Sequence, residues 1–306
     1  MTRVLCVGEC MLELTHLDST TARLGIAGDT YNTAVYLRRV AQLLCAEAEV
    51  GYLTGLGTDQ YSADMRARWL TEGVVDHSLP VEGGMPGLYT VRVDDDGERR
   101  FSYWRSHSAA RKLFAGTDWA EHITGDLVHL SGITLQIASA PARQALSTRL
   151  RELRLRGTLV SFDTNYRPSG WCSPADAADA MDQFTELADI VFASWEDETA
   201  LHDCPNPAAA AARLAALGPR EVIVKTGADG AHLLTGGRLQ HTPAAIPARV
   251  LDTTAAGDSF AGAYLAARIT GRAPAEALRT ASEVAAVVIA HPGAITPGNV
   301  PLLSAG

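Results

Sequence analysis

Residues 252–266 read DTTAAGDSFAGAYLA, in which Asp252 and Asp258 enclose a run of small residues. Apolar residues recur at helical spacing over 259–271, which predicts a helix that begins at or just after the small residues. The first N–H groups of a helix lack carbonyl partners and lie at the positive end of its dipole. Small side chains let an anion approach them closely. The stretch therefore predicts an anion site made by Ala255, Ala256 and Gly257.

Asp258 falls in the first turn of that predicted helix, beside the anion site. A carboxylate placed there can take the proton of a hydroxyl group that attacks a phosphoryl group. The simpler alternative is that Asp258 only complements the helix dipole, as acids in a first helical turn commonly do. The density of small residues next to it favours the catalytic role.

The bulk properties are those of a soluble globular protein, because 47% of the 306 residues are hydrophobic and 20% are charged. The net charge is −9 and like charges form no long block, so we expect no nucleic-acid partner. The N-terminus lacks a signal-peptide layout, and no apolar stretch is long enough to span a membrane. Five cysteines without metal or redox spacing are expected as reduced thiols. We therefore expect a cytoplasmic protein.

Apolar strands alternate with amphipathic helices along most of the chain. Core strands are predicted at 3–9 and 50–57, and strands or strand-turn units at 126–133, 158–165, 189–197 and 221–234. Further helices are predicted at 27–44, 61–74, 140–157 and 207–218, and the first of these would be capped by Asp29 or Thr30. This alternation predicts one α/β domain over residues 1–306, with a mostly parallel central sheet and helices on both faces.

Residues 87–106 interrupt the alternation, because two runs of alternating apolar and polar residues are joined by Asp94–Gly97. An Asp-Gly turn between such runs indicates a β-hairpin. Together with an alternating strand at 11–18, the hairpin is expected to form a small β lid. Because an exposed strand edge can pair with a second copy, we expect a homo-oligomer formed through this lid.

The stretch DTTAAGDSFAGAYLA resembles the C-terminal signature of the ribokinase-like (PfkB) sugar kinases, and the resemblance extends over most of the chain. It implies a ribokinase-like three-layer fold with a small β lid, and transfer of phosphate from ATP with the help of Mg²⁺. By this resemblance Asp258 is the catalytic base, and Ala255, Ala256 and Gly257 stabilise charge on the transferred group. Asp252 would hold the loop and bind a monovalent cation such as K⁺.

Other motifs of that family have counterparts at the expected ends of parallel strands, where ligands bind. AGDTYNTAVYLRR (27–39) is similar to the sugar-binding loop, although Ala27 replaces its first glycine, and it implies that Gly28, Asp29 and Asn32 contact sugar hydroxyls. VKTGADGAHLL (224–234) resembles the nucleotide loop, whereas no Walker P-loop is present. The residues expected to contact ATP are Asn165, Ser194, Lys225, Thr226, Gly227, Gly230 and Gly257.

One motif of the family is altered in this chain. The N-x-x-E pattern that manages metal and phosphate aligns with residues 194–197, so that Ser194 replaces asparagine and Asp197 replaces glutamate. The carboxylate persists in a shorter form, which makes Asp197 the expected Mg²⁺ residue, and Glu198 competes for the role.

The predicted hairpin carries aromatic and basic residues that suit an acidic sugar. Tyr103 and Arg105 alternate along one strand and should share a face with Phe101 and with Tyr89 of the partner strand. Since guanidinium binds carboxylate bidentately, Arg105 and Arg167 favour a substrate that carries a carboxylate. The alternative is that Arg105 is a solvated sheet residue and Tyr103 a packing residue.

The stretch YWRSHSAAR, together with GDTYNTAVYL, DTNYRP and HPGAITP, resembles the branch of the family that phosphorylates 2-keto-3-deoxygluconate. This implies transfer to the terminal O6 hydroxyl, with the arginines at the carboxylate and keto end. Two other functions stay open: a kinase for a neutral sugar such as fructose or ribose, and a catalytically weak sugar-acid sensor. The sequence does not distinguish gluconate- from galactonate-derived epimers. His107, His129 and His291 lack the spacing of a zinc site.

Overall fold

The computed structural model describes residues 1–93, 99–247 and 249–298. Its main feature is a nine-stranded sheet with the order β15-β14-β13-β12-β11-β10-β1-β4-β6. The parallel part contains β1 (Thr2–Val7), β4 (Ala48–Leu53), β6 (Val74–Asp76), β10 (Leu127–Ser131), β11 (Leu159–Asp163), β12 (Ile190–Ser194) and β13 (Glu221–Lys225). The antiparallel edge contains β14 (Ala231–Thr235) and β15 (Arg238–Thr242). The predicted mostly parallel sheet is thus confirmed.

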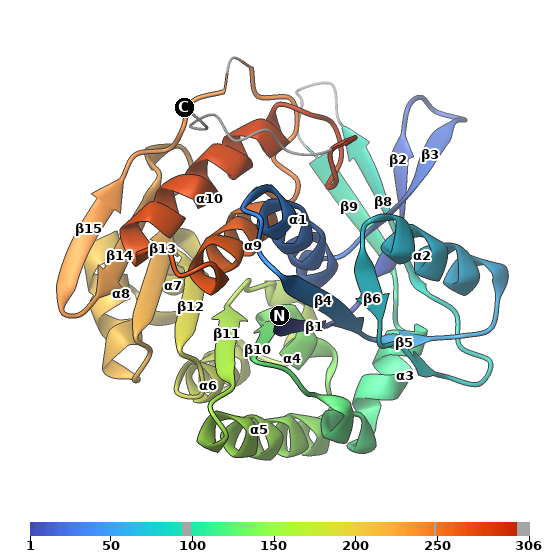
Figure 1. The fold of residues 1–306 in the computed structure, drawn as a ribbon. Helices are drawn as coiled ribbons and strands as arrows, with labels where there is room; N and C mark the ends of the chain where they lie inside the picture. The colour runs from blue at the N-terminus through green and yellow to red at the C-terminus, as the bar shows by residue number, and fades with distance from the viewer. Residues whose placement is uncertain (94–98, 248, 299–306) are drawn as a thin grey trace.

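Helices cover both faces of this sheet, which gives three layers (Figure 1). One face is covered by α1 (Asp29–Leu43), α2 (Gln60–Thr71), α9 (Ala256–Ile269) and α10 (Pro274–Ile289). The other face is covered by α3 (Ala109–Ala115), α4 (Gly132–Ile137), α5 (Ala140–Leu155), α6 (Pro174–Thr185), α7 (Trp195–His202) and α8 (Pro207–Ala216).

β1 shows why both faces need cover. Its side chains alternate between two apolar cores, with Val4 and Cys6 in one and Leu5 and Val7 in the other. Because consecutive side chains of a strand point to opposite faces, the apolar run of residues 4–7 must be buried on both sides.

The starts of the helices are encoded by short polar side chains. On the second face, helices begin at residues whose side-chain oxygen accepts a backbone N–H of the first turn. These N-caps are Ser108, Ser131, Ser139, Ser173, Ser194 and Asn206.

The start of α1 differs from these helices, and the predicted capping by Asp29 or Thr30 is wrong. Gly28 is the N-cap and makes no side-chain cap, so Asp29 is already helical. A Cβ on Gly28 would lie 2.3 Å from the Glu9 carbonyl oxygen, so only glycine fits there. The Asp29 carboxylate is left to contact other elements.

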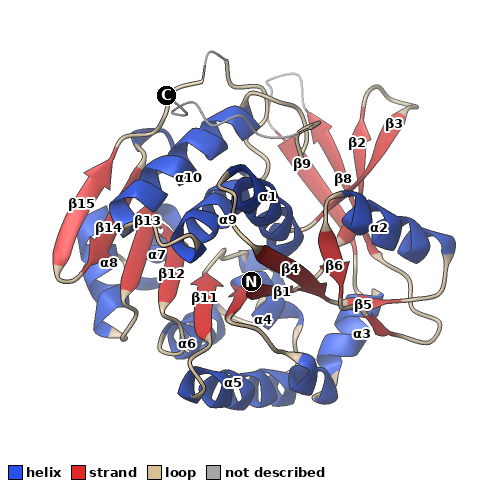
Figure 2. Ribbon diagram, in the orientation of Figure 1, coloured by secondary structure: helices blue, strands red, loops and turns tan. Residues whose placement is uncertain are grey.

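A second sheet lies beside the main one and contains the predicted hairpin (Figure 2). Its order is β3-β2-β8-β9, formed by β3 (Ala22–Ala27), β2 (Met11–His16), β8 (Gly87–Val93) and β9 (Arg99–Trp104). Tyr89 stands opposite Tyr103 in the antiparallel β8–β9 pair. β3 was not predicted, and the predicted turn at Asp94–Gly97 lies outside the described residues. A short third sheet joins β5 (Gly55–Leu56) and β7 (Leu79–Pro80).

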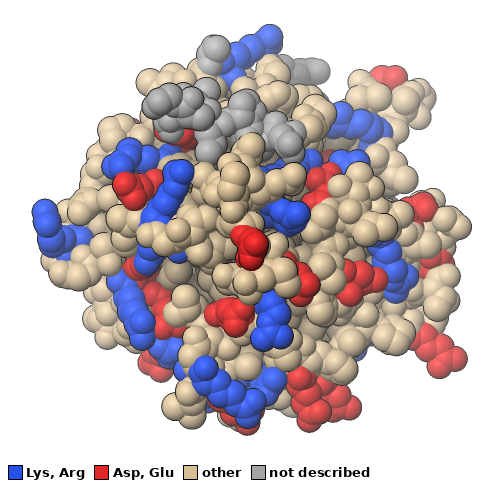
Figure 3. Space-filling view, in the orientation of Figure 1, with Lys and Arg blue, Asp and Glu red and all other residues tan. Residues whose placement is uncertain are grey.

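Acidic and basic side chains are interspersed on the face shown in Figure 3. Within the described ranges, no helix combines the length and apolarity that crossing a membrane requires. All five cysteines have free thiols.

Candidate active site

The helix that DTTAAGDSF predicts is α9, and its first turn carries Asp258. Ala255 is the N-cap and has a φ of 61°, in the left-handed region that disfavours any residue with a Cβ. The Ala256 N–H donates to the Thr253 carbonyl at 3.2 Å. Of the predicted anion-binding residues, Ala256 therefore already has a partner within the loop.

The Asp258 carboxylate is held by α1. Asn32 Nδ2 donates to Asp258 Oδ2 at 2.8 Å, and Thr33 Oγ1 donates to the Asp258 carbonyl at 3.2 Å. Although part of the residue is solvent-exposed, its carboxyl is surrounded by protein, and this burial raises the pKa of Asp258 to about 7. Repulsion from Asp29 and Asp163 adds to the shift, whereas the Asn32 hydrogen bond and Lys225 oppose it. A carboxyl that titrates near neutrality is well suited to accept a proton.

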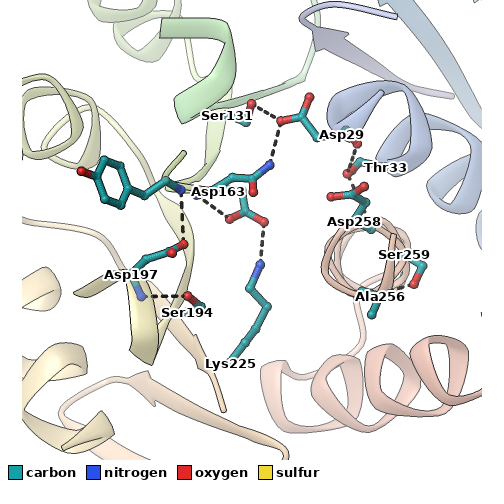
Figure 4. A network of polar contacts seen from close by, with 12 residues as sticks. Asp29, Thr33, Ser131, Asp163, Ser194, Asp197, Lys225, Ala256, Asp258 and Ser259 are labelled. Atoms are coloured by element: carbon teal, nitrogen blue, oxygen red, sulfur yellow. Dashed lines mark hydrogen bonds and ion pairs between the residues drawn. The ribbon is translucent and has the colours of Figure 1, made fainter. Parts of the chain in front are cut away.

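A chain of polar contacts connects the carboxyl ends of three strands to the start of α1 (Figure 4). Lys225 Nζ at the end of β13 donates to Asp163 Oδ2 at the end of β11, at 2.8 Å. The Asn165 N–H donates to Asp163 Oδ1 at 3.2 Å, and Asn165 Nδ2 donates to Asp29 Oδ2 at 2.9 Å. Ser131 Oγ at the end of β10 also donates to Asp29 Oδ2. The predicted residues from separate segments are thus brought together.

Two side chains predicted to bind sugar hydroxyls have partners within the protein. Asn32 accepts the Gly28 N–H through Oδ1, at 3.4 Å, in addition to donating to Asp258. Asp29 accepts from both Ser131 and Asn165. These contacts position the two groups at the site, and their contact with sugar stays a prediction.

The predicted nucleotide loop is a closed turn between β13 and β14. The backbone N–H and the Oγ1 of Thr226 both donate to the Gly230 carbonyl, at 2.8 and 3.0 Å. Gly230 has a φ of 102°, and a Cβ there would lie 2.1 Å from the Thr242 carbonyl oxygen. Gly227 also has a positive φ, of 58°. The turn presents Lys225 toward the site, while the Thr226 hydroxyl is engaged within the turn itself.

The altered N-x-x-E motif forms the start of α7. Ser194 Oγ accepts the Asp197 N–H at 3.0 Å, and Asp197 Oδ2 accepts the Tyr166 N–H at 3.2 Å. Burial raises the pKa of Asp197, and Arg167 and Lys225 oppose this shift, so both cations lie near its carboxylate.

Glu198, the competitor for the metal role, lies elsewhere. It is buried and accepts from Arg213 Nε and Nη2, at 3.0 and 2.8 Å. This pairing favours Asp197 over Glu198. Over the part of the chain that the structure describes, no three His, Cys, Asp or Glu residues are grouped as a metal site. Metal binding by Asp197 therefore stays a prediction.

The aromatic face expected on the hairpin is present. The ring centroids of Tyr89 and Tyr103 are 5.8 Å apart, and Phe101 lies 6.3 Å from each. Tyr103 is 51% exposed and so is open to a ligand, whereas Tyr89 is buried. Partial burial of the Tyr103 side chain raises its pKa, and the guanidinium groups of Arg105 and Arg167 oppose this. Both arginines therefore lie close to this tyrosine.

The two arginines have different surroundings. Arg105 forms an ion pair with Glu9, whose side chain is fully buried. Arg167 is exposed and donates from Nη1 to the Tyr166 carbonyl at 2.8 Å. The sequence interpretation missed Glu9, and it also missed Glu13, which accepts from the Tyr89 hydroxyl. Acids inside the apolar run GECMLEL were the available signal, because buried carboxylates need partners.

Asp252, at the beginning of the opening stretch, ties two loops together. Its Oδ1 accepts the Thr254 N–H at 2.8 Å and its Oδ2 accepts the Gly293 N–H at 2.6 Å. The segment 291–297, HPGAITP, is thereby held against the start of α9.

Two other features lie outside the site. A surface depression of about 630 Å³ at the opposite ends of the strands contains Arg151, Arg154 and Asp189 and none of the site residues. His129 is buried, with Nδ1 3.0 Å from Ser161 Oγ, and burial lowers its pKa to about 4.

The three-layer fold is that of ribokinase-like kinases. A PfkB protein from Polaromonas sp. JS666 superposes with a TM-score of 0.80 at 25% identity, over 94% of this chain and 95% of that one. A 2-dehydro-3-deoxygluconokinase from Thermotoga maritima superposes with a TM-score of 0.80 at 20% identity, over 97% and 96% of the two chains.

Sequence comparison gives the family. Residues 1–301 match the pfkB family carbohydrate kinase description, and the chain belongs to that family. It is 40% identical over 304 residues to a 2-dehydro-3-deoxygluconokinase from Escherichia coli (strain K12), covering 96% of this chain and 97% of the relative. A protein of the same name from Dickeya dadantii is 38% identical over 303 residues, covering 96% of each chain.

Proposed function

We propose that this protein is an ATP-dependent kinase that phosphorylates 2-keto-3-deoxygluconate at O6, giving 2-keto-3-deoxy-6-phosphogluconate. The observation that carries the proposal is the pairing of two features in one site. Asp258, with a pKa of about 7, stands at the start of α9, and Tyr103 on the lid lies within the electrostatic influence of Arg105 and Arg167. The names of the relatives at 38–40% identity support the same substrate.

In the proposed reaction, Asp258 accepts the proton of the O6 hydroxyl as that oxygen attacks the γ-phosphorus of ATP. The new O–P bond forms as the bond to the β-phosphate oxygen breaks, and ADP leaves with the bonding electrons. The N-terminus of α9 and the Lys225 ammonium stabilise the charge on the transferred group. Asn32 keeps the Asp258 carboxylate oriented toward the substrate.

The charges of the site explain why a divalent cation would be needed. Two carboxylates, Asp29 and Asp163, repel the carboxylate of Asp258, and the ammonium of Lys225 opposes them. A polyphosphate would enter this acidic environment only with its charge reduced. Carboxylate oxygens are suitable ligands for Mg²⁺, and Asp197 is the residue we assign to it. When bound, Mg²⁺ would neutralise phosphate charge and help orient ATP. Binding of K⁺ at Asp252 stays a prediction.

The structure sharpens how the substrate carboxylate would be recognised. Arg105 is balanced by the buried Glu9, so its charge is largely offset before substrate arrives. Arg167 is exposed and its charge acts on both Tyr103 and Asp197, so its guanidinium can donate to a carboxylate bound near them. We therefore assign the main carboxylate contact to Arg167, with Arg105 and the tyrosines shaping the keto end.

The whole chain would act as one cytoplasmic α/β domain, with the β3-β2-β8-β9 sheet as its lid. A second copy would pair on the outer side of this lid, where Leu24 and Trp104 are 52% and 60% exposed.

The test is ADP release measured with 2-keto-3-deoxygluconate, its galactonate-derived epimer, fructose, ribose and adenosine. We expect turnover with the sugar acid and only weak turnover with neutral substrates. Higher turnover with fructose or ribose would establish the neutral-sugar alternative, and nucleotide binding without any turnover would indicate a sensor.

A further inference from the structure

Asp163 and Lys225 form a close pair that the proposed mechanism uses only in part. Lys225 Nζ lies 2.8 Å from Asp163 Oδ2, and their side chains are 19% and 7% exposed. The residues lie at the carboxyl ends of β13 and β11, and β12 runs between these strands. The pair therefore crosses the end of β12, and Asp163 is held in turn by the Asn165 N–H at 3.2 Å.

The ammonium of Lys225 also faces the start of α9. A Cβ built on Gly257 would lie 3.2 Å from Lys225 Nζ, with only the adjoining carbon of the same side chain as its other neighbour within 4 Å. An ammonium has three N–H donors, of which Asp163 takes one. The others are available to a group lying between Lys225 and the first turn of α9 (Figure 4).

We propose that Asp163 is a positioning residue for phosphoryl transfer, because it holds the Lys225 ammonium over the first turn of α9. The inference rests on the proposed kinase function and adds a residue to it. A lysine side chain has four flexible carbons and many rotamers. Anchored at Asp163, the ammonium stays where a phosphoryl oxygen would lie, and it keeps one N–H on Asp163 while donating the others to the phosphate.

Asp163 has a second effect through its charge. It is one of the two carboxylates whose repulsion raises the pKa of Asp258. Loss of its charge should therefore lower the pKa of Asp258 and move the acid limb of turnover to lower pH. The charged and titratable groups that face Asp258 are Asp29 and Tyr36 on α1, Asp163 on β11 and Lys225 on β13.

The first measurement is binding of a non-hydrolysable ATP analogue with Mg²⁺ by calorimetry, without sugar. Asp163→Asn keeps an oxygen for the Asn165 N–H but loses the charge that anchors Lys225, so we expect about tenfold weaker binding. Asp163→Glu should restore part of the affinity. The matched control is Asp126→Asn, an exposed carboxylate at the other end of the sheet, which should leave the affinity unchanged.

The second measurement separates positioning from general damage, by a double-mutant cycle with Lys225→Met. If Asp163 acts through Lys225, Asp163→Asn should have little further effect on nucleotide affinity in the Lys225→Met background. Fully additive losses would overturn the proposal, and so would unchanged affinity in Asp163→Asn. If Asp163→Asn does not fold, Asp163→Glu replaces it in the cycle, and the same additivity criterion applies.

The outcomes remain distinct from those of the proposed function. Nucleotide binding is measured without sugar, so an incorrect substrate leaves the cycle intact. Conversely, the protein could turn over 2-keto-3-deoxygluconate while the losses of nucleotide affinity in the cycle are additive. That result would support the kinase function and reject the positioning role of Asp163.

Discussion

Lowering the pH from 8 to 6 should reduce kcat/KM for the sugar acid about tenfold, because Asp258 must be ionised to accept a proton. Burial raises its pKa to about 7. Roughly nine-tenths of the carboxyl would then be ionised at pH 8 and about one-tenth at pH 6. With the ordinary value of 3.8, Asp258 would be ionised at both pH values and the profile would be flat.

The assay is initial ADP release at saturating MgATP and limiting sugar acid, at constant ionic strength. Because ATP itself titrates in this range, Asn32→Ala provides the discriminating variant. It removes the 2.8 Å hydrogen bond that lowers the pKa of Asp258. A hydrogen bond to a charged group contributes about 1.5–3 kcal/mol, so the acid limb should move up by about 1–2 pH units. The assignment of Asp258 as the base would be refuted if the acid limb of the kcat/KM profile did not move in Asn32→Ala. A wild-type profile that is flat between pH 6 and pH 8 would refute it as well.

Two further predictions concern the base and the carboxylate contacts. Asp258→Asn should lose turnover by orders of magnitude while retaining nucleotide binding. Since the folded pKa of about 7 exceeds the ordinary 3.8, the ionised carboxylate destabilises the folded state above pH 7, and this cost disappears as the pH falls toward 3.8. At pH 8 the free energy of unfolding of Asp258→Asn should therefore exceed that of the unsubstituted protein by about 1–4 kcal/mol. A variant that melts at a lower temperature than the unsubstituted protein would contradict this reasoning. Arg167→Ala should raise KM for the sugar acid much more than for any neutral sugar, and equal effects would remove the carboxylate contact. Arg105→Ala should also raise KM for the sugar acid. In addition it should destabilise the fold by about 3–5 kcal/mol, because Glu9 is left buried and unpaired. A double variant with Glu9→Gln and Arg105→Gln should recover part of that stability in a thermal melt.

Local patterns in the sequence were sufficient for most of the central sheet and for α9. Strands such as β1 and β10 are mostly apolar, and the glycines and small residues before α9 mark its start. β3 gave little signal, because Ala22–Ala27 contains a glycine, is largely exposed at its start and is stabilised by pairing with β2. α10 was missed although Pro274 at its first turn and a strong apolar period were visible.

The site shows a sharper limit. The residue types and their strand-end positions were predictable, because parallel strands bring their carboxyl ends to one edge. The pairings were not. Lys225 and Asp163 are 62 residues apart, and only the strand order places them in contact. Asp29 was expected as a cap, yet Gly28 occupies the cap, so the carboxylate reaches Ser131 and Asn165.

The substrate of the protein and the role of Asp258 can both be tested by the products formed in competition. The protein is given limiting MgATP and equal amounts of 2-keto-3-deoxygluconate, fructose and ribose, and the phosphorylated products are identified by ³¹P NMR and mass spectrometry. We predict that nearly all transferred phosphate is on O6 of the sugar acid, at least about 100-fold in excess over the neutral sugars, and that Asp258→Asn gives no product. Phosphate mainly on fructose or ribose, or undiminished product with Asp258→Asn, would contradict the account.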